Sequence, residues 1–555
     1  MPDQSHAVTR VLMVFPRFNA NSFWNFAEAC EVKGAKAAAP PLGLITVAAL
    51  LPEHWSTHLI NRNTGDLTDD DIRGADVVFT GGMLPQERDT MEIIRMCRRL
   101  GVPVAVGGPS ATSTPEMYEE ADFVVGGEAE GIIGEFVAAW ERGERSGRLM
   151  APKFQADVTK TPIPRYDLLK FSDYLFVGVQ FSRGCPFTCE FCDIIELYGR
   201  VPRTKTTPQM LAELDRLMAL GYRGHVDFVD DNLIGNKKAV KAFLPHLIEW
   251  QKARGYPFKF TTEASLNLSD DQELLGLMAK ANFFLVFCGI ESPDEETLVA
   301  TSKKQNTRRS ISESVHRIYD AGIAVTAGFI IGFDTEKGSI SKPMTGCISD
   351  TAVPLAVVGL LTALPNTQLS RRLRKEGRLF KDFTAHSEDP GDASTAGLNF
   401  TTLRPRREIL LDFRETVAAV YAPDAFFARV RTVGRKLGKQ KLPELKVNWR
   451  LAAYDLRSFL RTVWRINTRH PELARHFWGT LWETARHNPR ALEVVVTNII
   501  VYLHLYPFSR YVVGEIDGAL QRMESGRFVE PLPLPAPANS DVTPDFKAGK
   551  RLAVA

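Results

Sequence analysis

In the stretch Arg183-Gly184-Cys185-Pro186-Phe187-Thr188-Cys189-Glu190-Phe191-Cys192-Asp193, three of the seven cysteines of this chain fall within eight residues. The glycine and proline in the stretch predict a turn-rich loop. A [4Fe–4S] cluster normally takes four cysteine thiolates, one on each iron. Because only three thiols lie close together here, we expect a [4Fe–4S] cluster in which one iron is open to another ligand.

Two other interpretations of these thiols are a structural zinc half-site and cysteines without a shared role. Zinc needs a fourth ligand close by, and residues 178–221 contain no further cysteine and no histidine. The other cysteines are isolated and give no disulfide pattern, as expected in a reducing compartment. They are Cys30, Cys97, Cys288 and Cys347.

The length and charge of the chain limit its class. At 555 residues it is too long for one ordinary core, so two or three domains are expected. The net charge of +2 gives no reason to expect a nucleic-acid partner, although the last third is richer in arginine. The apolar run over residues 11–15 is too short for a signal peptide, which favours a cytoplasmic protein.

Residues 1–145 alternate short apolar runs with helical patterns, which predicts a doubly wound parallel sheet. Glycines follow several of the expected strands, at the carboxyl ends where open α/β sheets bind ligands. We expect them to let a bulky flat or phosphorylated ligand approach the backbone. The candidates are Gly81, Gly82, Gly107, Gly108 and Gly127, with Glu128 directly after the last. For each glycine the alternative is a tight turn between strand and helix.

A proline-stiffened linker is expected over residues 146–175, and a second α/β domain over residues 176–385. A strand, a loop and a helix recur in this domain, which predicts a partial (β/α)6 barrel. The expected strands cover residues 175–181, 225–229, 258–262, 284–289, 325–331 and 356–361.

Polar and glycine residues follow the expected barrel strands, at the ends where barrels place catalytic groups. The candidates are Asp230 and Asp231 after the second strand, Glu263 after the third, Gly289 and Glu291 at the fourth, and Gly328 and Gly332 at the fifth. For any one carboxylate the alternative is a solvated helix cap or a salt-bridged loop residue. Cys288 lies in an apolar run and is expected to be a buried small hydrophobic residue.

The last third of the chain is expected to form a helical domain over residues 386–530 and a disordered, proline-rich tail over residues 531–555. Its apolar run over residues 494–506 is shorter than the roughly 20 residues that span a bilayer, so we expect a buried helix. Tryptophans set among many arginines favour, as the alternative, a surface that rests on a membrane.

The spacing Cys-x3-Cys-x2-Cys, with an aromatic residue before the last cysteine, resembles the radical S-adenosylmethionine (SAM) superfamily. In that superfamily the open iron holds the amino and carboxylate groups of SAM. The glycine turns of the first domain, with Pro40-Pro41-Leu42-Gly43-Leu44, resemble the cobalamin-binding domain of one subgroup. The Asp-x-His-x-x-Gly motif of classical cobalamin methyltransferases is absent, so no histidine ligand to cobalt is expected. The three-part layout resembles radical enzymes of the hopanoid methylase and bacteriochlorophyll methylase type.

The resemblance implies roles for the candidate residues. Cys185, Cys189 and Cys192 would bind the cluster, and Phe191 would lie against the adenine of SAM. Asp230 or Asp231 would contact the amino group of SAM, and Glu263 and Glu291 its hydroxyl or amino groups. Gly328 and Gly332 would let the nucleoside pass, and Gly289 is a further cofactor-binding candidate. One departure is that the usual Gly-Gly-Glu after the second strand is Asp230-Asp231-Asn232 here.

The resemblance also implies the reaction and the partners. The expected enzyme is a cobalamin-dependent radical SAM methyltransferase that acts on an unactivated carbon of an apolar or amphipathic small molecule, such as a hopanoid-like lipid or a tetrapyrrole. An electron donor such as ferredoxin or flavodoxin would reduce the cluster, and a peripheral membrane contact would bring lipid substrates within reach. The alternatives are a cobalamin-dependent radical cyclase or rearrangement enzyme, and a cluster or cobalamin sensor without catalytic activity.

Overall fold

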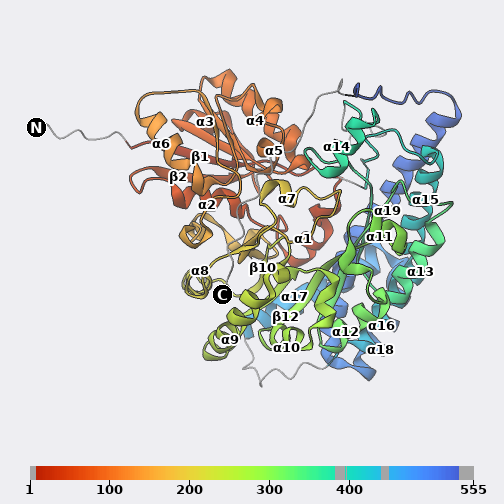
Figure 1. The fold of residues 1–555 in the computed structure, drawn as a ribbon. Helices are drawn as coiled ribbons and strands as arrows, with labels where there is room; N and C mark the ends of the chain where they lie inside the picture. The colour runs from red at the N-terminus through yellow and green to blue at the C-terminus, as the bar shows by residue number, and fades with distance from the viewer. Residues whose placement is uncertain (1–7, 20, 382–393, 396, 439–448, 537–555) are drawn as a thin grey trace, which may run out of the picture.

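The computed structural model describes residues 8–19, 21–381, 394–395, 397–438 and 449–536 (Figure 1). The N-terminal sheet has six parallel strands in the order β2-β1-β3-β4-β5-β6. These strands are β1 (Arg10–Phe15), β2 (Ser56–Asn61), β3 (Val77–Gly81), β4 (Val104–Gly107), β5 (Phe123–Gly126) and β6 (Gly147–Met150).

Helices cover both faces of this sheet, each over its own apolar core. One core packs Ile93 and Ile94 of α4 against the strands, and the other packs Phe136 and Trp140 of α6 against the opposite face. The helices of this part are α1 (Ala27–Lys33), α2 (Leu42–Leu50), α3 (Asp69–Arg73), α4 (Glu87–Leu100), α5 (Gly108–Ser113) and α6 (Ile133–Glu141). The predicted doubly wound sheet is confirmed, with an edge strand, β6, inside the range expected to be a linker.

The central sheet also has six parallel strands, in the order β14-β13-β12-β11-β10-β7. They are β7 (Val177–Val179), β10 (Gly224–Phe228), β11 (Phe258–Glu263), β12 (Phe283–Glu291), β13 (Ala324–Ile331) and β14 (Ala356–Leu360). Because neighbours in the sheet are also consecutive strands of the repeat and β7 does not pair with β14, the sheet is an open, partial barrel. All six predicted strands are present.

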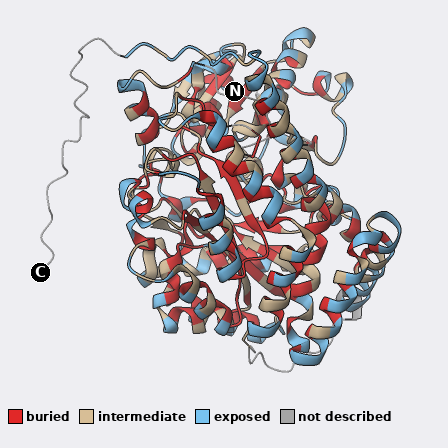
Figure 2. Ribbon diagram, turned by 90° about the vertical axis from the view of Figure 1, so that its right-hand side faces the viewer, coloured by how far each residue is buried: buried red, intermediate tan, exposed pale blue. Residues whose placement is uncertain are grey.

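Helices and one short ribbon connect the barrel strands. The helices are α7 (Ile194–Leu197), α8 (Thr207–Ala219), α9 (Lys237–Ala253), α10 (Gln272–Lys280), α11 (Glu295–Ala300), α12 (Ile311–Asp320), α13 (Ser341–Thr351) and α14 (Gln368–Lys375). The ribbon pairs β8 (Ser182–Arg183) with β9 (Arg203–Thr204) in antiparallel fashion. Buried residues follow the strands and the inward faces of the helices, and exposed residues cover the outer helix faces (Figure 2).

The C-terminal part is helical, as predicted. Its helices are α15 (Arg406–Val420), α16 (Pro423–Lys436), α17 (Trp449–Arg469), α18 (Ala474–His487) and α19 (Leu492–Glu524). Their apolar faces belong to the same core as the barrel. Tyr502 of α19, for example, stacks on Phe426 of α16 with ring centroids 3.7 Å apart. The C-terminal helices are therefore packed onto the barrel rather than forming a separate body.

The apolar run over residues 494–506 lies in α19. By length and composition this is the single helix of the described residues that could cross a membrane, but 56% of its most apolar window is buried against the protein. The predicted tail begins as ordered chain, because Leu534 donates from its backbone N–H to the carbonyl of Leu379 at 2.7 Å. Residues 537–555, which make up the rest of the predicted tail, lie outside the described residues.

Candidate active site

The cysteine loop runs from β8 to α7, after the first barrel strand. Within the loop, the backbone N–H of Cys192 donates to the carbonyl of Cys189 at 3.2 Å. The N–H of Cys185 donates to the carbonyl of Gly199, also at 3.2 Å. Gly184 has φ +94°, and a Cβ there would lie 2.9 Å from the same carbonyl oxygen. Glycine before the first cysteine is therefore required by the turn itself.

Two amide side chains and one ammonium group surround the thiols. Asn232 Nδ2 lies 3.9 Å from Cys185 Sγ, and Gln305 Nε2 lies 3.7 Å from Cys189 Sγ. Burial raises the pKa of Cys185 and Cys192, and the nearby charge of Lys303 partly counters this. Donors and a cation around sulfur stabilise thiolate ligands, so these surroundings fit an iron–sulfur cluster. Among the described residues, no three His, Cys, Asp or Glu side chains are close enough together to hold a metal ion, and because the three loop cysteines are part of that result, it does not separate zinc from a cluster.

Asp230 and Asp231 hold the start of the cysteine loop. The Asp230 carboxylate accepts hydrogen bonds from the backbone N–H groups of Phe181, at 3.0 Å, and Ser182. It also accepts from the Ser182 hydroxyl, and its residue is only 1% exposed. Asp231 accepts from the N–H of Gly184 at 3.1 Å. The structure thus gives Asp230 a loop-anchoring task, and Asp231 is the half-buried carboxylate of the two.

Glu263 is the last residue of β11 and is exposed, whereas the three residues before it are buried. Desolvation by the neighbouring barrel atoms, together with the charges of Asp227 and Asp231, raises the pKa of Glu263 to about 8. At neutral pH this side chain is therefore protonated and offers an O–H donor as well as an acceptor. Below it in the barrel, Asp227 accepts from the Thr261 hydroxyl at 2.5 Å.

A buried ion pair lies at the end of β12. Glu291 Oε1 and Lys303 Nζ are 2.7 Å apart, and both side chains are about nine-tenths buried. A Cβ on Gly289 would lie 2.3 Å from that carboxylate oxygen, so Gly289 makes room for the pair. Glu291 itself has φ +70°, a strained conformation for a non-glycine residue. The ammonium of Lys303 also interacts with Cys189 and Cys192, which links the pair to the thiols.

The remaining candidates of the barrel also have internal packing partners. A Cβ on Gly328 would lie 3.2 Å from Cζ of Phe287. Gly332 has φ +112° and donates its N–H to Glu336 at 3.0 Å. The Phe191 ring lies 5.9 Å from that of Phe333 and 6.0 Å from the Lys303 ammonium. Contact of these residues with a nucleoside stays a prediction.

At the N-terminal sheet, the glycines form an edge without side chains. A Cβ on Gly81 would lie 2.1 Å from the carbonyl oxygen of Gly107, because β3 and β4 pair closely there. Gly108 and Gly127 have φ of +88° and +86°. A Cβ on Gly82 would lie 2.6 Å from Oε1 of Gln86. The turns alone therefore require glycine at several positions. Because these positions carry no side chain, a flat macrocycle could also approach the backbone closely there.

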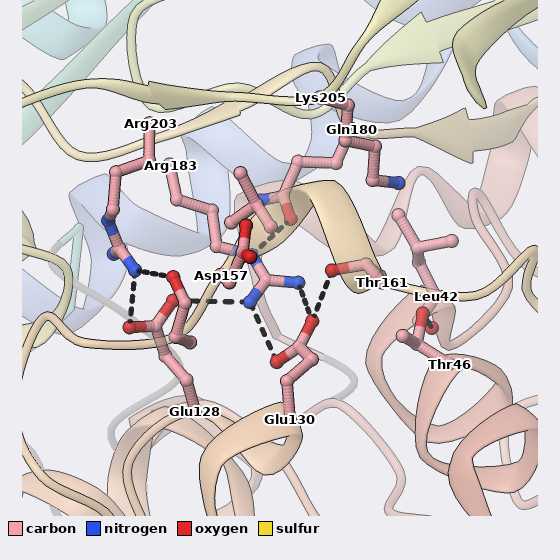
Figure 3. Close-up of polar contacts among 12 residues, drawn as sticks. Leu42, Thr46, Glu128, Glu130, Asp157, Thr161, Gln180, Arg183, Arg203 and Lys205 are labelled. Carbon is pink, nitrogen blue, oxygen red and sulfur yellow. Dashed lines mark hydrogen bonds and ion pairs between the residues drawn. The ribbon is translucent and has the colours of Figure 1, made fainter. Parts of the chain in front are cut away.

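Glu128, whose predicted contact with a cofactor stays a prediction, lies in a cluster of ion pairs with Arg183 and Arg203 (Figure 3). Its carboxylate binds Arg183 at 3.2 Å and Arg203 at 2.8 Å. Glu130 binds Arg183 through two hydrogen bonds of 2.7 and 2.9 Å and accepts one from Thr161. Although burial opposes it, the Arg183 hydrogen bonds lower the pKa of Glu130 to about 2. This interdomain clamp, defined as Glu128, Glu130, Arg183 and Arg203, fixes the glycine edge beside the cysteine loop.

Sequence reasoning did not find Arg203, Lys303 or Gln305. Each is a common polar residue outside any motif, and only the fold brings it to the thiols or to the clamp. Arg183 stands two residues before Cys185, which was the one available signal for the clamp.

A partial barrel whose first strand leads into a three-cysteine loop defines a radical SAM enzyme. Residues 179–339 match the family model of the radical SAM superfamily, and residues 367–518 match a domain of unknown function (DUF4070). The chain is 43% identical over 516 residues to an uncharacterized methyltransferase of Synechocystis sp., covering 92% of this chain and 94% of that protein. It is 38% identical over 424 residues to the hopanoid C-2 methylase of Rhodopseudomonas palustris, covering 76% and 78%.

The chain therefore belongs to the cobalamin-binding radical SAM family that includes hopanoid C-2 methylase. A more distant relative is the anaerobic magnesium-protoporphyrin IX monomethyl ester cyclase of Cereibacter sphaeroides, 25% identical over 55% of this chain and 54% of that protein. Two solved structures share the fold. They are OxsB with aqua-cobalamin and SAM bound (TM-score 0.57, 15% identity, 94% of this chain and 84% of that chain) and TsrM from Kitasatospora setae with cobalamin and a [4Fe–4S] cluster bound (TM-score 0.52, 16% identity, 67% and 78%).

Proposed function

We propose that this radical SAM enzyme transfers a methyl group to an unactivated carbon of an apolar or amphipathic small molecule, with a hopanoid-like lipid as the first candidate. The observation that carries the proposal is the interdomain clamp. Arg183, two residues before the first cluster cysteine, binds Glu128 and Glu130 at the carboxyl edge of the N-terminal sheet. A cluster site and a glycine edge that suits a macrocycle are thereby held side by side.

The chemistry divides between the cofactors and the chain. When bound, the reduced cluster with SAM supplies a 5′-deoxyadenosyl radical, and methylcobalamin supplies the methyl group. Cys185, Cys189 and Cys192 would hold the cluster, and Lys303 balances the negative charge of their thiolates. Asp231 and Glu263 would hydrogen-bond a polar ligand at the carboxyl ends of the barrel strands. The bare edge at Gly81, Gly107 and Gly108 would accept the corrin ring.

A lipid substrate agrees with an exposed apolar surface on the C-terminal helices. Leu456, Leu460 and Trp464 of α17 are spaced four residues apart and are 59%, 58% and 57% exposed, so they share one helix face. Trp478 and Trp482 of α18 are 47% and 72% exposed. The rings of Phe459 and Phe477, 6.3 Å apart, join the two helices. Exposed arginines surround this face, including Arg457, Arg475 and Arg486.

This surface supports peripheral contact with a membrane, because tryptophan and arginine favour the interface of an anionic bilayer. The Trp464→Ala/Trp482→Ala double variant should sediment less with anionic vesicles than the wild type, while Trp250→Phe, a buried control, should not change. Equal sedimentation of the double variant and the wild type would contradict the contact.

The alternative function is a cobalamin-dependent cyclase or rearrangement, because a cyclase is among the distant relatives and would use the same site. Mass spectrometry of the small products separates the two functions. The enzyme would be reconstituted without oxygen with iron, sulfide and hydroxocobalamin, and reduced with SAM and candidate lipids. Methyl transfer predicts 5′-deoxyadenosine, S-adenosylhomocysteine and a methylated lipid in equal amounts. Formation of 5′-deoxyadenosine without S-adenosylhomocysteine would contradict methyl transfer.

A second variant tests the observation that carries the proposal. Glu130→Gln weakens the clamp without touching the thiols, so 5′-deoxyadenosine should still form while the yield of methylated product per 5′-deoxyadenosine falls about tenfold. Glu135→Gln, an exposed change on α6, should leave that ratio unchanged. An unchanged ratio in Glu130→Gln would show that methyl transfer does not depend on the interdomain clamp.

A further inference from the structure

Positive charge is concentrated on α14 and the residues that follow it. Residues 368–381 contain six basic residues and one acidic residue, a net charge of +5, in a chain whose total charge is +2. The basic residues are Arg371, Arg372, Arg374, Lys375, Arg378 and Lys381, and the acidic residue is Glu376. So strong a local excess produces a positive potential over this helix.

The same helix lies directly against the cysteine loop, beside α7 (Figure 1). The backbone N–H of Leu369 donates to the carbonyl of Glu190 at 2.9 Å. Arg372 binds the Glu190 carboxylate at 2.5 Å, and Arg371 binds Glu196 at 2.7 Å. Glu190 directly follows Cys189 in the chain. The helix α14 therefore contacts the residue next to a cysteine that would bind the cluster.

A second basic segment flanks the loop on another side. The N–H of Glu190 donates to the carbonyl of Thr301 at 3.0 Å, and Gln305 donates to Cys189 Sγ. Lys304, between these two contacts, is exposed. The Cys189–Glu190 peptide is thus held between two segments that both present basic side chains to solvent.

The acidic residues around α14 do not cancel this charge. Glu190, Glu196, Asp334 and Glu376 are each paired with an arginine of the helix or with Arg378. Arg374 and Lys375 are exposed and have no ion-pair partner among the described residues. Arg372 and Arg378 therefore hold the helix in place, whereas Arg374 and Lys375 are available to a partner.

From this geometry we propose that Lys304, Arg374 and Lys375 form the docking surface for an acidic one-electron carrier protein of the flavodoxin or ferredoxin type. The inference rests on the proposed function, because the cluster must receive one electron before SAM is cleaved. In the step, the carrier loses one electron and the cluster gains it, and no atom is transferred. Opposite charges on two proteins accelerate their encounter and orient it, and electron-transfer interfaces are small, so a few charges are sufficient.

The test measures reduction of the oxidised, reconstituted cluster by a reduced flavodoxin, followed by absorbance in a stopped-flow instrument. In the Arg374→Glu/Lys375→Glu variant the second-order rate constant should fall about tenfold at low salt, and its dependence on salt should flatten. The control is Lys252→Glu/Lys280→Glu, which makes the same change of charge at exposed positions near the C-terminal ends of α9 and α10. The control should keep at least half of the wild-type rate constant.

Reduction with dithionite distinguishes this surface from the function itself. The α14 variant should give the same electron paramagnetic resonance signal and the same yield of 5′-deoxyadenosine as the wild type when dithionite replaces flavodoxin. Loss of that yield would show a damaged site rather than lost docking, and the Arg374→Ala/Lys375→Ala variant would then be tested in its place. A wild-type rate constant with flavodoxin, or an equal loss in the α9/α10 control, would overturn the proposal.

Discussion

The carboxyl edges of the two sheets handle ligands by opposite means. The barrel edge carries ionisable side chains, Asp231, Glu263 and the Glu291–Lys303 pair, and desolvation there raises the pKa of Asp231 and of Glu263. The N-terminal edge carries glycines whose backbones nearly touch, as at Gly81 and Gly107. The first edge suits a charged ligand that side chains recognise, and the second suits a flat ligand that backbone contacts support. Removal of side chains should therefore damage the first edge, and their addition the second.

The largest expected effect comes from the thiols. Cys185→Ala, Cys189→Ala and Cys192→Ala should each abolish formation of 5′-deoxyadenosine, because each removes one of three cluster ligands. Iron content and mass spectrometry of the products check this. Cys347→Ala, a half-buried cysteine of α13, is the matched control and should retain both iron and activity. Retained activity in any of the three loop variants would contradict the role of that cysteine as a cluster ligand at the barrel edge.

At the glycine edge, addition of one methyl group should be destabilising. Gly81→Ala places a Cβ 2.1 Å from the Gly107 carbonyl oxygen, so the paired strands must separate. We expect a loss of about 1–3 kcal/mol in the free energy of unfolding, measured with urea, and weaker retention of cobalamin. Gly65→Ala, where nothing lies within 4 Å of the new atom, should change neither quantity. Equal stability of the two variants would show that β3 and β4 can accommodate a Cβ at residue 81 without loss of stability.

A smaller effect should follow from loss of the amide at Cys189. Gln305→Leu removes an N–H donor from the sulfur, and donors to cluster sulfurs raise the reduction potential. The potential of the cluster should fall by tens of millivolts, on the order of one tenfold change in the one-electron equilibrium. Potentiometric titration followed by electron paramagnetic resonance measures it, with Gln368→Leu at the start of α14 as the control. A potential within a few millivolts of the wild type would contradict the contact.

The smallest effect concerns the stability of the protein as a function of pH. The pKa of Glu263 is raised from its ordinary 4.5 to about 8, so between these values the folded protein binds more protons than the unfolded chain. Stability from this group is complete below the unfolded pKa and falls as pH rises toward 8. The Glu263→Gln variant should therefore match the wild type near pH 5 and gain relative stability by pH 8. If the urea midpoints of the two proteins changed in parallel from pH 5 to pH 8, the pKa of Glu263 would not be raised in the folded protein.

Much of the fold could be predicted from the sequence because the barrel strands are continuous apolar runs. All six predicted strands are present, whereas β2 and β6 were missed because they are edge strands with partly polar faces. The dipeptide Thr207-Pro208 predicts a helix that is capped by Thr207, but in the structure Thr206 caps α8 in a capping box with Gln209. Local propensity placed the helix, and only hydrogen-bond geometry decides which of two threonines caps it.

The site was less predictable than the fold. The cysteine motif is local in sequence, so it could be found without a structure. Glu128 and Asp230 were predicted to bind cofactors, which stays a prediction, and their protein partners, Arg203 and Ser182, belong to the ribbon of β8 and β9. Spacing along one strand carries no information about which distant side chain will complete a pair.

The interdomain clamp has a consequence for how this architecture can be recombined. Its two glutamates belong to the first 145 residues, and its two arginines flank the cysteine loop. A chimera that exchanges only the N-terminal domain between relatives would leave two buried guanidinium groups unmatched wherever the incoming domain lacks those glutamates. The N-terminal domain and the cysteine loop that it binds should therefore be exchanged together. The junction of such a chimera should lie after Thr204 rather than in the linker.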